Sequence, residues 1–171
     1  DRPSEEQWRT DAAEILRARP ALLRLERRDA RLDVTAFLDS PFHGALFAQT
    51  PRSPAAPETA LACASGARKG TGAFSGTYFL ATGPDQGMEL IDLCLPIKSD
   101  GTLDGYLVAT YSLTRLLEVI GEEVARTHEL SLVESDGTRL ARSGRVRGGG
   151  AFHAERVVDL PGSALQLRVE S

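Results

Sequence analysis

Residues 88–113 have the sequence MELIDLCLPIKSDGTLDGYLVATYSL, and this stretch decides the fold. It holds two apolar runs, 88–97 and 103–111, which are separated by the turn-forming pair Asp100-Gly101. A third strand-like run, 73–81, lies just before them. Because neighbouring strands with short connections pair antiparallel, we expect these three runs to form an antiparallel meander.

Ahead of the meander, the spacing of apolar residues changes from helical to strand-like and back. Apolar residues recur at helical spacing over residues 4–18, and period-two alternation then predicts a β-hairpin over 22–38. Residues 39–56 have no sustained period, so we expect a loop with one helical turn. A proline at the first helical position predicts a further helix near 57–68.

The chain after the meander is predicted to contain one helix and four short strands. Ser112 can cap the helix, whose buried face is expected to consist of Leu113, Leu116, Leu117, Ile120 and Val124. Alternating apolar residues and turn signals predict strands over 129–134, 138–142, 152–159 and 165–169. The sequence contains no internal repeat of the solenoid type.

Composition excludes several classes of protein. The 171 residues are 42% apolar, as in a globular domain. The sequence contains no run of about 18 apolar residues, which is the length needed to span a membrane. A net charge of −4 argues against nucleic acid as a partner, because that binding requires a surplus of basic residues. The arginine-rich segment 17–31 is interleaved with acidic residues and is expected to be a solvated surface.

Cysteines, histidines and motifs give no indication of catalysis. Cys63 and Cys94 form neither a disulfide framework nor a metal site; one bridge is possible, but two unbridged cysteines are the favoured expectation. The three histidines are isolated, so no metal is expected. No nucleophile elbow and no phosphate-binding loop is complete. We therefore expect a chain that is not an enzyme and needs no cofactor.

Asp92 is the most informative polar residue, because it interrupts an apolar strand, where a carboxylate requires a partner or water. In one interpretation it lines a small cavity with Tyr78 and Tyr111, and Arg68 or Lys69 is its cation. In the other, it points to solvent from an open sheet face. The candidate ligand-binding residues are Arg68, Ser75, Tyr78, Asp92, Tyr106, Thr110 and Tyr111.

The order of these elements resembles the Cache sensor domains, which are PAS-like and are also called PDC domains. The likeness is strongest in 88–113, where an apolar strand, Leu-Pro-Ile, a Gly turn, a Gly-x-Leu-x-Ala strand and a helix follow in order. Residues 130–141 and 160–169 are similar to the first hairpin and last strand of a second PAS-like module. The resemblance implies an α+β fold with a PAS-like antiparallel sheet, a long N-terminal helix and a reduced second β module. The implied division is a helix and distal sensing module over 1–127 and a membrane-proximal module over 128–171.

The resemblance also implies a function, namely the periplasmic or extracytoplasmic sensing domain of an inner-membrane receptor such as a sensor histidine kinase. Such a domain would bind a small molecule, form a homodimer along its first helix and be tethered by flanking membrane helices. A carboxylate held by Arg68 is the preferred ligand, since guanidinium groups bind carboxylates in bidentate fashion. The absence of a second Trp beside Trp8 argues against an amino acid. The alternatives are a module that reads a periplasmic protein without a small ligand, and a cytosolic PAS-type interaction domain.

Overall fold

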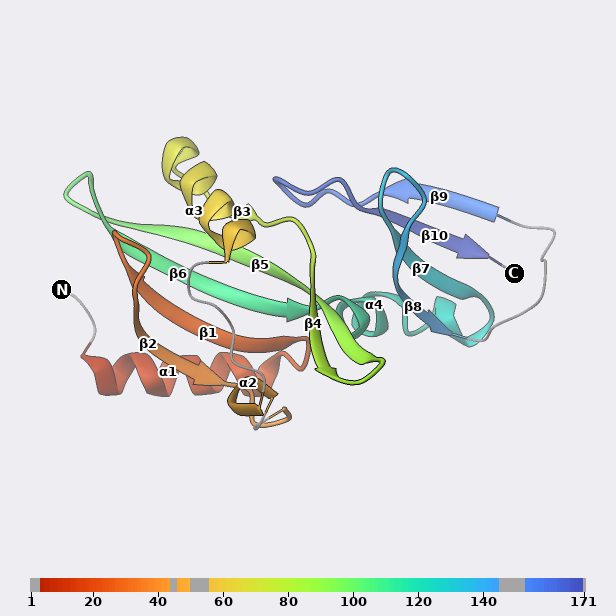
Figure 1. The fold of residues 1–171 in the computed structure, drawn as a ribbon, viewed down its shortest axis with the longest axis horizontal. Helices are drawn as coiled ribbons and strands as arrows, with labels where there is room; N and C mark the ends of the chain where they lie inside the picture. Colours follow the sequence, from red (N-terminus) through yellow and green to blue (C-terminus); the bar gives the residue numbers. More distant parts are fainter. Residues whose placement is uncertain (1–3, 44–45, 50–55, 145–152, 171) are drawn as a thin grey trace.

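Two antiparallel sheets lie end to end in an elongated molecule (Figure 1). The structure is a computed structural model that describes residues 4–43, 46–49, 56–144 and 153–170. A six-stranded sheet occupies the N-terminal part of the chain, and a four-stranded sheet occupies the C-terminal part. This arrangement confirms the expected α+β fold with a long N-terminal helix and antiparallel sheets.

The larger sheet has the strand order β2-β1-β6-β5-β3, and β4 pairs with the first half of β5. Its strands are β1 (Leu22–Asp29), β2 (Val34–Asp39), β3 (Ala73–Phe74), β4 (Tyr78–Gly83), β5 (Gln86–Ser99) and β6 (Thr102–Ser112). The hairpin and the meander expected from the sequence are both present.

The predicted strand over 73–81 is divided into β3 and β4, which corrects the expectation of a single strand. Phe74 pairs with Leu93 of β5, and Tyr78 pairs with Leu90. Three residues, 75–77, therefore lie opposite only two residues of β5. Because the two chains cannot stay in register across this unequal span, the ladder is interrupted there.

Helices cover both faces of the larger sheet (Figure 1). On one face, α1 (Glu5–Ala18) packs Ala12 and Leu16 against β1 and β6. On the opposite face, α3 (Pro57–Lys69) packs against β5, and the short α2 (Leu46–Gln49) packs Phe47 onto Leu23 and Leu90. The central strands are consequently buried on both faces, so polar residues on them are removed from water.

The smaller sheet has the order β8-β7-β10-β9. Its strands are β7 (Glu129–Val133), β8 (Arg139–Gly144), β9 (His153–Val157) and β10 (Gln166–Glu170). Helix α4 (Leu113–Gly121) and the 3₁₀ turn η1 (Val124–Arg126) lead from one sheet to the other. Leu113 and Leu117 of α4 share a core with Leu130, Leu132 and Leu165 of the C-terminal part.

The buried face of α4 is only partly the predicted one. Leu113 and Leu117 are buried, but Ile120 is 65% exposed and Val124, beyond the end of α4, is 43% exposed. Gly121 is buried instead, and a Cβ at Gly121 would collide with the side chain of Leu130. The helix thus approaches β7 through a residue without a side chain, which turns Ile120 toward solvent.

Cys63 of α3 and Cys94 of β5 form a disulfide, with a Cα–Cα distance of 5.1 Å. This corrects the expectation of unbridged cysteines. The two residues lie 31 positions apart, and they meet because α3 packs across β5. Both cysteines are fully buried beside Ala62, Tyr106 and Val108.

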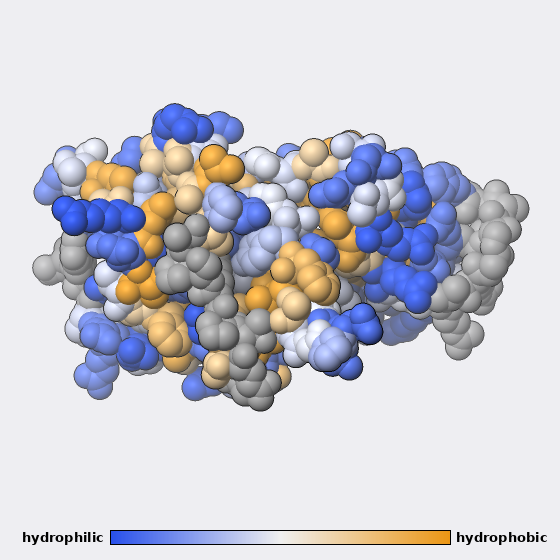
Figure 2. Space-filling view, in the orientation of Figure 1, coloured by the Kyte–Doolittle hydropathy of each residue, from blue (hydrophilic) through white to orange (hydrophobic). Residues whose placement is uncertain are grey.

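The two sheets differ in the surface that they present. On the face of the molecule that Figure 2 shows, apolar surface lies in the middle, around β4, and mostly hydrophilic side chains cover the smaller sheet. On β4, Phe79 is exposed. Within the described ranges, no helix combines the length and the apolar character needed to cross a membrane.

Candidate functional site

Asp92 lies in the middle of β5, fully buried beneath the N-terminal end of α3. Its Oδ2 accepts a hydrogen bond from the Thr59 hydroxyl at 2.6 Å. Its Oδ1 accepts one from the Thr110 hydroxyl at 2.8 Å and one from the Tyr78 hydroxyl at 3.0 Å. The Asp92 backbone N–H donates to the Ser75 hydroxyl oxygen at 2.9 Å. Side chains from two strands, β4 and β6, and from one helix, α3, therefore converge on a single carboxylate, and Ser75 binds the main chain beside it.

Local sequence explains this convergence. Asp92 pairs directly with Thr110 across β5 and β6, and directly paired residues of antiparallel strands project to the same face. Tyr78 enters at the start of β4 opposite Leu90, two positions from Asp92 and on the same face. Pro57 starts α3, which places Thr59 in the first helical turn, above the sheet.

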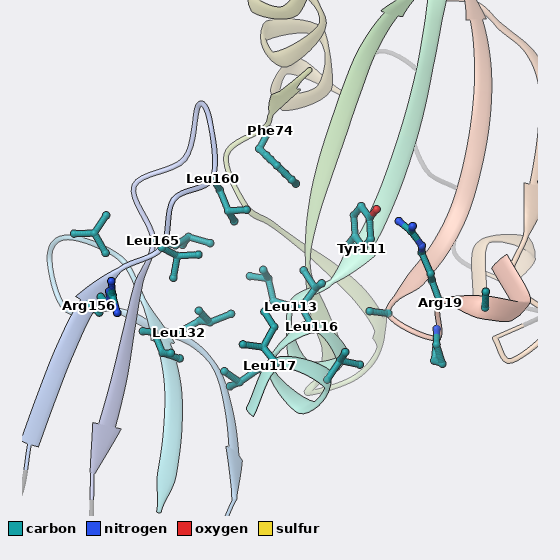
Figure 3. A pocket seen from close by; sticks show the side chains of 18 residues that line it. Arg19, Phe74, Tyr111, Leu113, Leu116, Leu117, Leu132, Arg156, Leu160 and Leu165 are labelled. Carbon is teal, nitrogen blue, oxygen red and sulfur yellow. The ribbon is translucent and has the colours of Figure 1, made fainter. Parts of the chain in front are cut away.

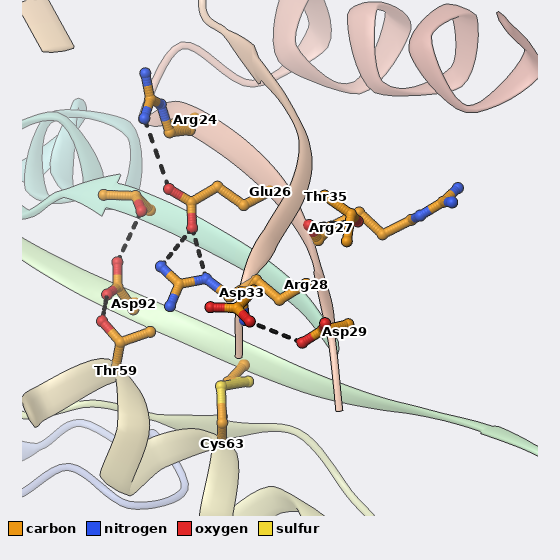
Figure 4. Close-up of polar contacts among 12 residues, drawn as sticks. Arg24, Glu26, Arg27, Arg28, Asp29, Asp33, Thr35, Thr59, Cys63 and Asp92 are labelled. Atoms are coloured by element: carbon orange, nitrogen blue, oxygen red, sulfur yellow. Dashed lines mark hydrogen bonds and ion pairs between the residues drawn. A yellow bond between two sulfur atoms is a disulfide. The ribbon is translucent and has the colours of Figure 1, made fainter. Parts of the chain in front are cut away.

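A buried ion pair on β1 lies on the same face of the larger sheet as Asp92. The Arg28 guanidinium donates to Glu26 Oε2 at 2.6 and 2.8 Å, and both residues are 2% exposed. Glu26 pairs with Val108, which is two residues from Thr110 along β6. Figure 4 shows this pair near Asp92, on the side of the sheet where the helix with Thr59 lies.

Arg24 extends this network toward β2. Its guanidinium binds Asp39 through two bonds of 2.5 and 3.0 Å and lies 3.7 Å from Glu26 Oε1. The same guanidinium stands over the rings of Phe37 and Phe47, 4.4 Å from each centroid. Such cation–π contacts hold an arginine in place where water is scarce. We define the polar cluster as Arg24, Glu26, Arg28, Asp39, Thr59, Ser75, Tyr78, Asp92 and Thr110.

The polar cluster is an unusual interior for a small domain. It combines two guanidinium groups with three carboxylates on a face covered by helices. Removing an ion from water costs several kcal/mol, and apolar residues of similar volume often serve stability as well or better. Chemically, the cluster offers charged groups of both signs and several hydroxyls, the groups that recognise a small polar molecule by direct hydrogen bonds.

The structure brings together four of the seven residues singled out in the sequence, namely Ser75, Tyr78, Asp92 and Thr110. Tyr106 is on the same face but packs beside the disulfide. Tyr111 is on the opposite face, where it pairs with Ile91 and Leu22. Arg68 is exposed in the last turn of α3, about two and a half helical turns from Thr59.

Of the two sequence-based interpretations of Asp92, the structure supports one part of the first, the contact with Tyr78. The open-face interpretation is wrong, because Asp92 is fully buried. The described contacts of its carboxylate come from hydroxyl groups, whereas Arg68 and Lys69 are exposed at the far end of α3. Helix α3 covers the sheet with its N-terminal turn here, which brings a threonine to Asp92.

Sequence reasoning missed five members of the polar cluster: Arg24, Glu26, Arg28, Asp39 and Thr59. The arginine-rich segment was expected to be solvated, yet the side chains of Arg24 and Arg28 are only 12% and 1% exposed. One signal was available, since Glu26 and Arg28 are two apart in a strand and therefore project to one face as opposite charges. What the pattern lacked was the information that α2 and α3 cover that face.

Metal binding has no support in the described ranges, where no three His, Cys, Asp or Glu residues are grouped so that they could hold an ion.

Comparison by sequence is uninformative. No protein-family model matches the chain. No curated protein matches it either.

Comparison by structure gives similar sensor domains. The chain superposes on the extracellular domain vpHK1S-Z8, assigned to a histidine kinase, with a TM-score of 0.67 and 12% identity, over 98% of this chain and 78% of that one. A domain of a sensory box/GGDEF family protein from Vibrio parahaemolyticus gives a TM-score of 0.66 and 12% identity, over 98% and 79%. The ligand-binding domain of the amino-acid chemoreceptor PctC of Pseudomonas aeruginosa PAO1, in complex with GABA, gives 0.56 and 14%, over 99% and 82%.

The fold is therefore that of the Cache, or PDC, sensor domains, as the sequence resemblance implied. At identities of 12–14% the likeness concerns the fold, and function has to be argued from the site.

Proposed function

We propose that this chain is the extracytoplasmic sensing domain of a transmembrane signalling receptor. The fold is shared with extracellular and ligand-binding domains of histidine kinases and chemoreceptors. The Cys63–Cys94 disulfide is independent support, because disulfides persist in oxidising compartments outside the cytoplasm. On this proposal the domain transmits a signal and catalyses no reaction, while the output, kinase or other, belongs to the rest of the receptor.

We further propose a division of labour within the chain. Residues 1–127 would be the distal sensing module and residues 128–171 the membrane-proximal one, with flanking membrane helices outside this sequence. The exposed surface of α1 would provide a homodimer contact. The core that α4 shares with Leu130 and Leu165 supports coupling between the two modules, because a shift of α4 would disturb both.

The polar cluster is the site that we assign to ligand recognition. The observation that carries this assignment is a largely buried set of charged and hydroxyl groups, drawn from one helix and five strands, where an apolar interior would be less costly. A small molecule that carries a carboxylate, an amine or both fits these groups. Structures of this fold include domains in complex with GABA and with L-Arg. An organic acid held by Arg68 remains a separate prediction.

A thermal-shift screen of amino acids, amines and organic acids tests this proposal. At about 100 times its dissociation constant, a ligand should raise the melting temperature of the domain by about 5–10 °C. The shift should fall to about half or less in Asp92→Asn and in Thr59→Val, and it should persist in Thr10→Val, which removes an exposed hydroxyl of α1. Arg68→Ala determines whether Arg68 takes part.

A second function, the reading of a periplasmic protein without a small ligand, is favoured by one observation. Asp92 already accepts three hydrogen bonds from the domain's own hydroxyls and is fully buried. If every compound leaves the melting temperature unchanged, and if Asp92→Asn leaves signalling by the whole receptor intact, the protein-reading function replaces the first.

A further inference from the structure

A cavity of about 570 Å³ lies between the two sheets, away from the polar cluster. One wall comes from α4 and the end of β6, and the other comes from β9, β10 and the segment 158–165 (Figure 3). Its volume is within the range of about 300–1,000 Å³ that is common for small-molecule pockets, which often form at module boundaries.

The lining of this cavity is almost entirely apolar. Leu116, Leu160 and Leu165 project into it, with Phe74 at its upper end in Figure 3. At its margin, Val119 is 64% exposed and Val157 is 68% exposed. Large apolar side chains that face water from two sides of one cavity are typical of a binding site rather than of an ordinary surface.

The charged residues described in the lining of the cavity are both arginines. Among the described residues that line it, only Arg19 and Arg156 are charged, and neither forms an ion pair with another described residue. Figure 3 shows Arg19 and the hydroxyl-bearing ring of Tyr111 at one end and Arg156 at the other. The Arg19 end thus offers a guanidinium and a phenol, which suit a carboxylate.

We propose that this cavity binds a single-chain aliphatic carboxylate, such as a medium-chain fatty acid. The carboxylate lies at Arg19 and Tyr111, and the alkyl chain runs between Leu116 of α4 and Leu160 and Leu165 of the C-terminal part. A ligand placed in this way touches both sheets, so its binding changes the free energy of their relative arrangement. This site is distinct from the polar cluster and goes beyond the sensing function proposed there.

Titration calorimetry with octanoate, decanoate and dodecanoate, below their micelle concentrations, tests the proposal on the whole chain. Binding should saturate at one molecule per chain. Two added methylenes should strengthen it on the order of tenfold until the cavity is filled. Decyltrimethylammonium, with the same chain and the opposite charge, should bind more weakly.

Two matched pairs of variants locate the site. Val119→Glu places a carboxylate in the cavity and should weaken decanoate binding by about tenfold or more. Val124→Glu is the same substitution at an exposed valine outside the lining and should leave binding unchanged. Arg19→Gln should abolish the preference for decanoate over decyltrimethylammonium, whereas Arg17→Gln, in the last turn of α1, should retain it. All four positions are exposed, so the variants are expected to fold.

Three results would overturn the proposal. The first is the absence of saturable binding at every chain length. The second is an equal effect of the two variants in either pair. The third is a dimer in sedimentation velocity that Val119→Glu converts to a monomer, because a second copy of the chain would then occupy the cavity. The polar-cluster function is unaffected by these outcomes, since Thr59→Val should leave decanoate binding unchanged.

Discussion

At the scale of single residues, the interior of the larger sheet depends on how Asp92 is hydrogen-bonded. Thr110→Val preserves the shape of the side chain but removes one of the three hydroxyl donors to the carboxylate. Because a hydrogen bond to a charged group contributes about 1.5–3 kcal/mol, the free energy of unfolding should fall by that amount. Urea unfolding of the two proteins, followed by circular dichroism, measures the difference.

Thr10→Val is the matched control, since the Thr10 hydroxyl donates to the Glu6 carbonyl on the exposed side of α1. Its effect should stay within about 0.5 kcal/mol. Equal stability of Thr110→Val and the wild type would contradict the description of Asp92 as a buried, hydroxyl-satisfied carboxylate.

The same scale shows what the sequence could not supply. Asp92 was recognised from its position in an apolar strand, and Thr110 follows from the pairing of adjacent strands. Thr59 and Arg28 could not be associated with it, because their approach depends on how α3 and β1 pack, and the periodicity of one segment carries no information about packing partners. The burial of Arg28 departs from the general rule that arginines lie on surfaces. The expectation that segment 17–31 is solvated rested on that rule.

At the scale of elements, the disulfide fixes α3 to β5. Its two cysteines close a segment with a sequence separation of 31, and the entropy lost by the unfolded chain corresponds to about 3–4 kcal/mol. The Cys63→Ala/Cys94→Ala variant should be less stable by about that amount in urea unfolding. Because Thr59 is one turn before Cys63, the variant should also loosen the Thr59–Asp92 contact, which amide exchange in α3 would detect.

Reductant provides the control for this prediction. It should destabilise the wild type and leave the double-alanine variant unchanged, since that variant has no bond to lose. A wild type whose unfolding is insensitive to reductant under denaturing conditions would show that the cysteines are not bridged in solution.

Most elements follow from local pattern, and the exceptions have packing causes. Helices α1 and α3 and strands β5 and β6 lie close to their predicted ranges because caps, prolines and turn residues mark their ends. The interruption between β3 and β4 arises from unequal pairing with β5, which only the partner strand reveals. The exposure of Ile120 follows from the contact of Gly121 with β7 and not from the helix itself.

At the scale of the whole molecule, a glutamate of the N-terminal part of the chain and a glutamate of the C-terminal part repel each other. Partial burial and the nearby charge of Glu134 raise the pKa of Glu89 above its ordinary value of 4.5. Glu89 is on β5 and Glu134 follows β7. Because the folded-state pKa of Glu89 is raised, the contribution of this residue to stability is fully present below pH 4.5. That contribution is lost as the pH rises through the folded-state pKa of Glu89.

Glu89→Gln should therefore raise the melting temperature at pH 7 by a small margin and have no such effect near pH 4. Glu118→Gln, which removes an exposed partner of Arg115 on α4, should give no gain at either pH. Melting curves at the two pH values provide the comparison, and an equal gain for Glu89→Gln at both would rule out charge repulsion as its cause.

The central claim, that the polar cluster recognises a small molecule, is tested most directly by titration calorimetry. The compound with the largest thermal shift would be titrated into the wild type, Asp92→Asn and the exposed control Asp136→Asn. Loss of a hydrogen bond from a charged partner should weaken binding to Asp92→Asn by about tenfold or more, and binding to Asp136→Asn should be unchanged. If all three proteins bind the compound with the same affinity, the polar cluster is not the binding site.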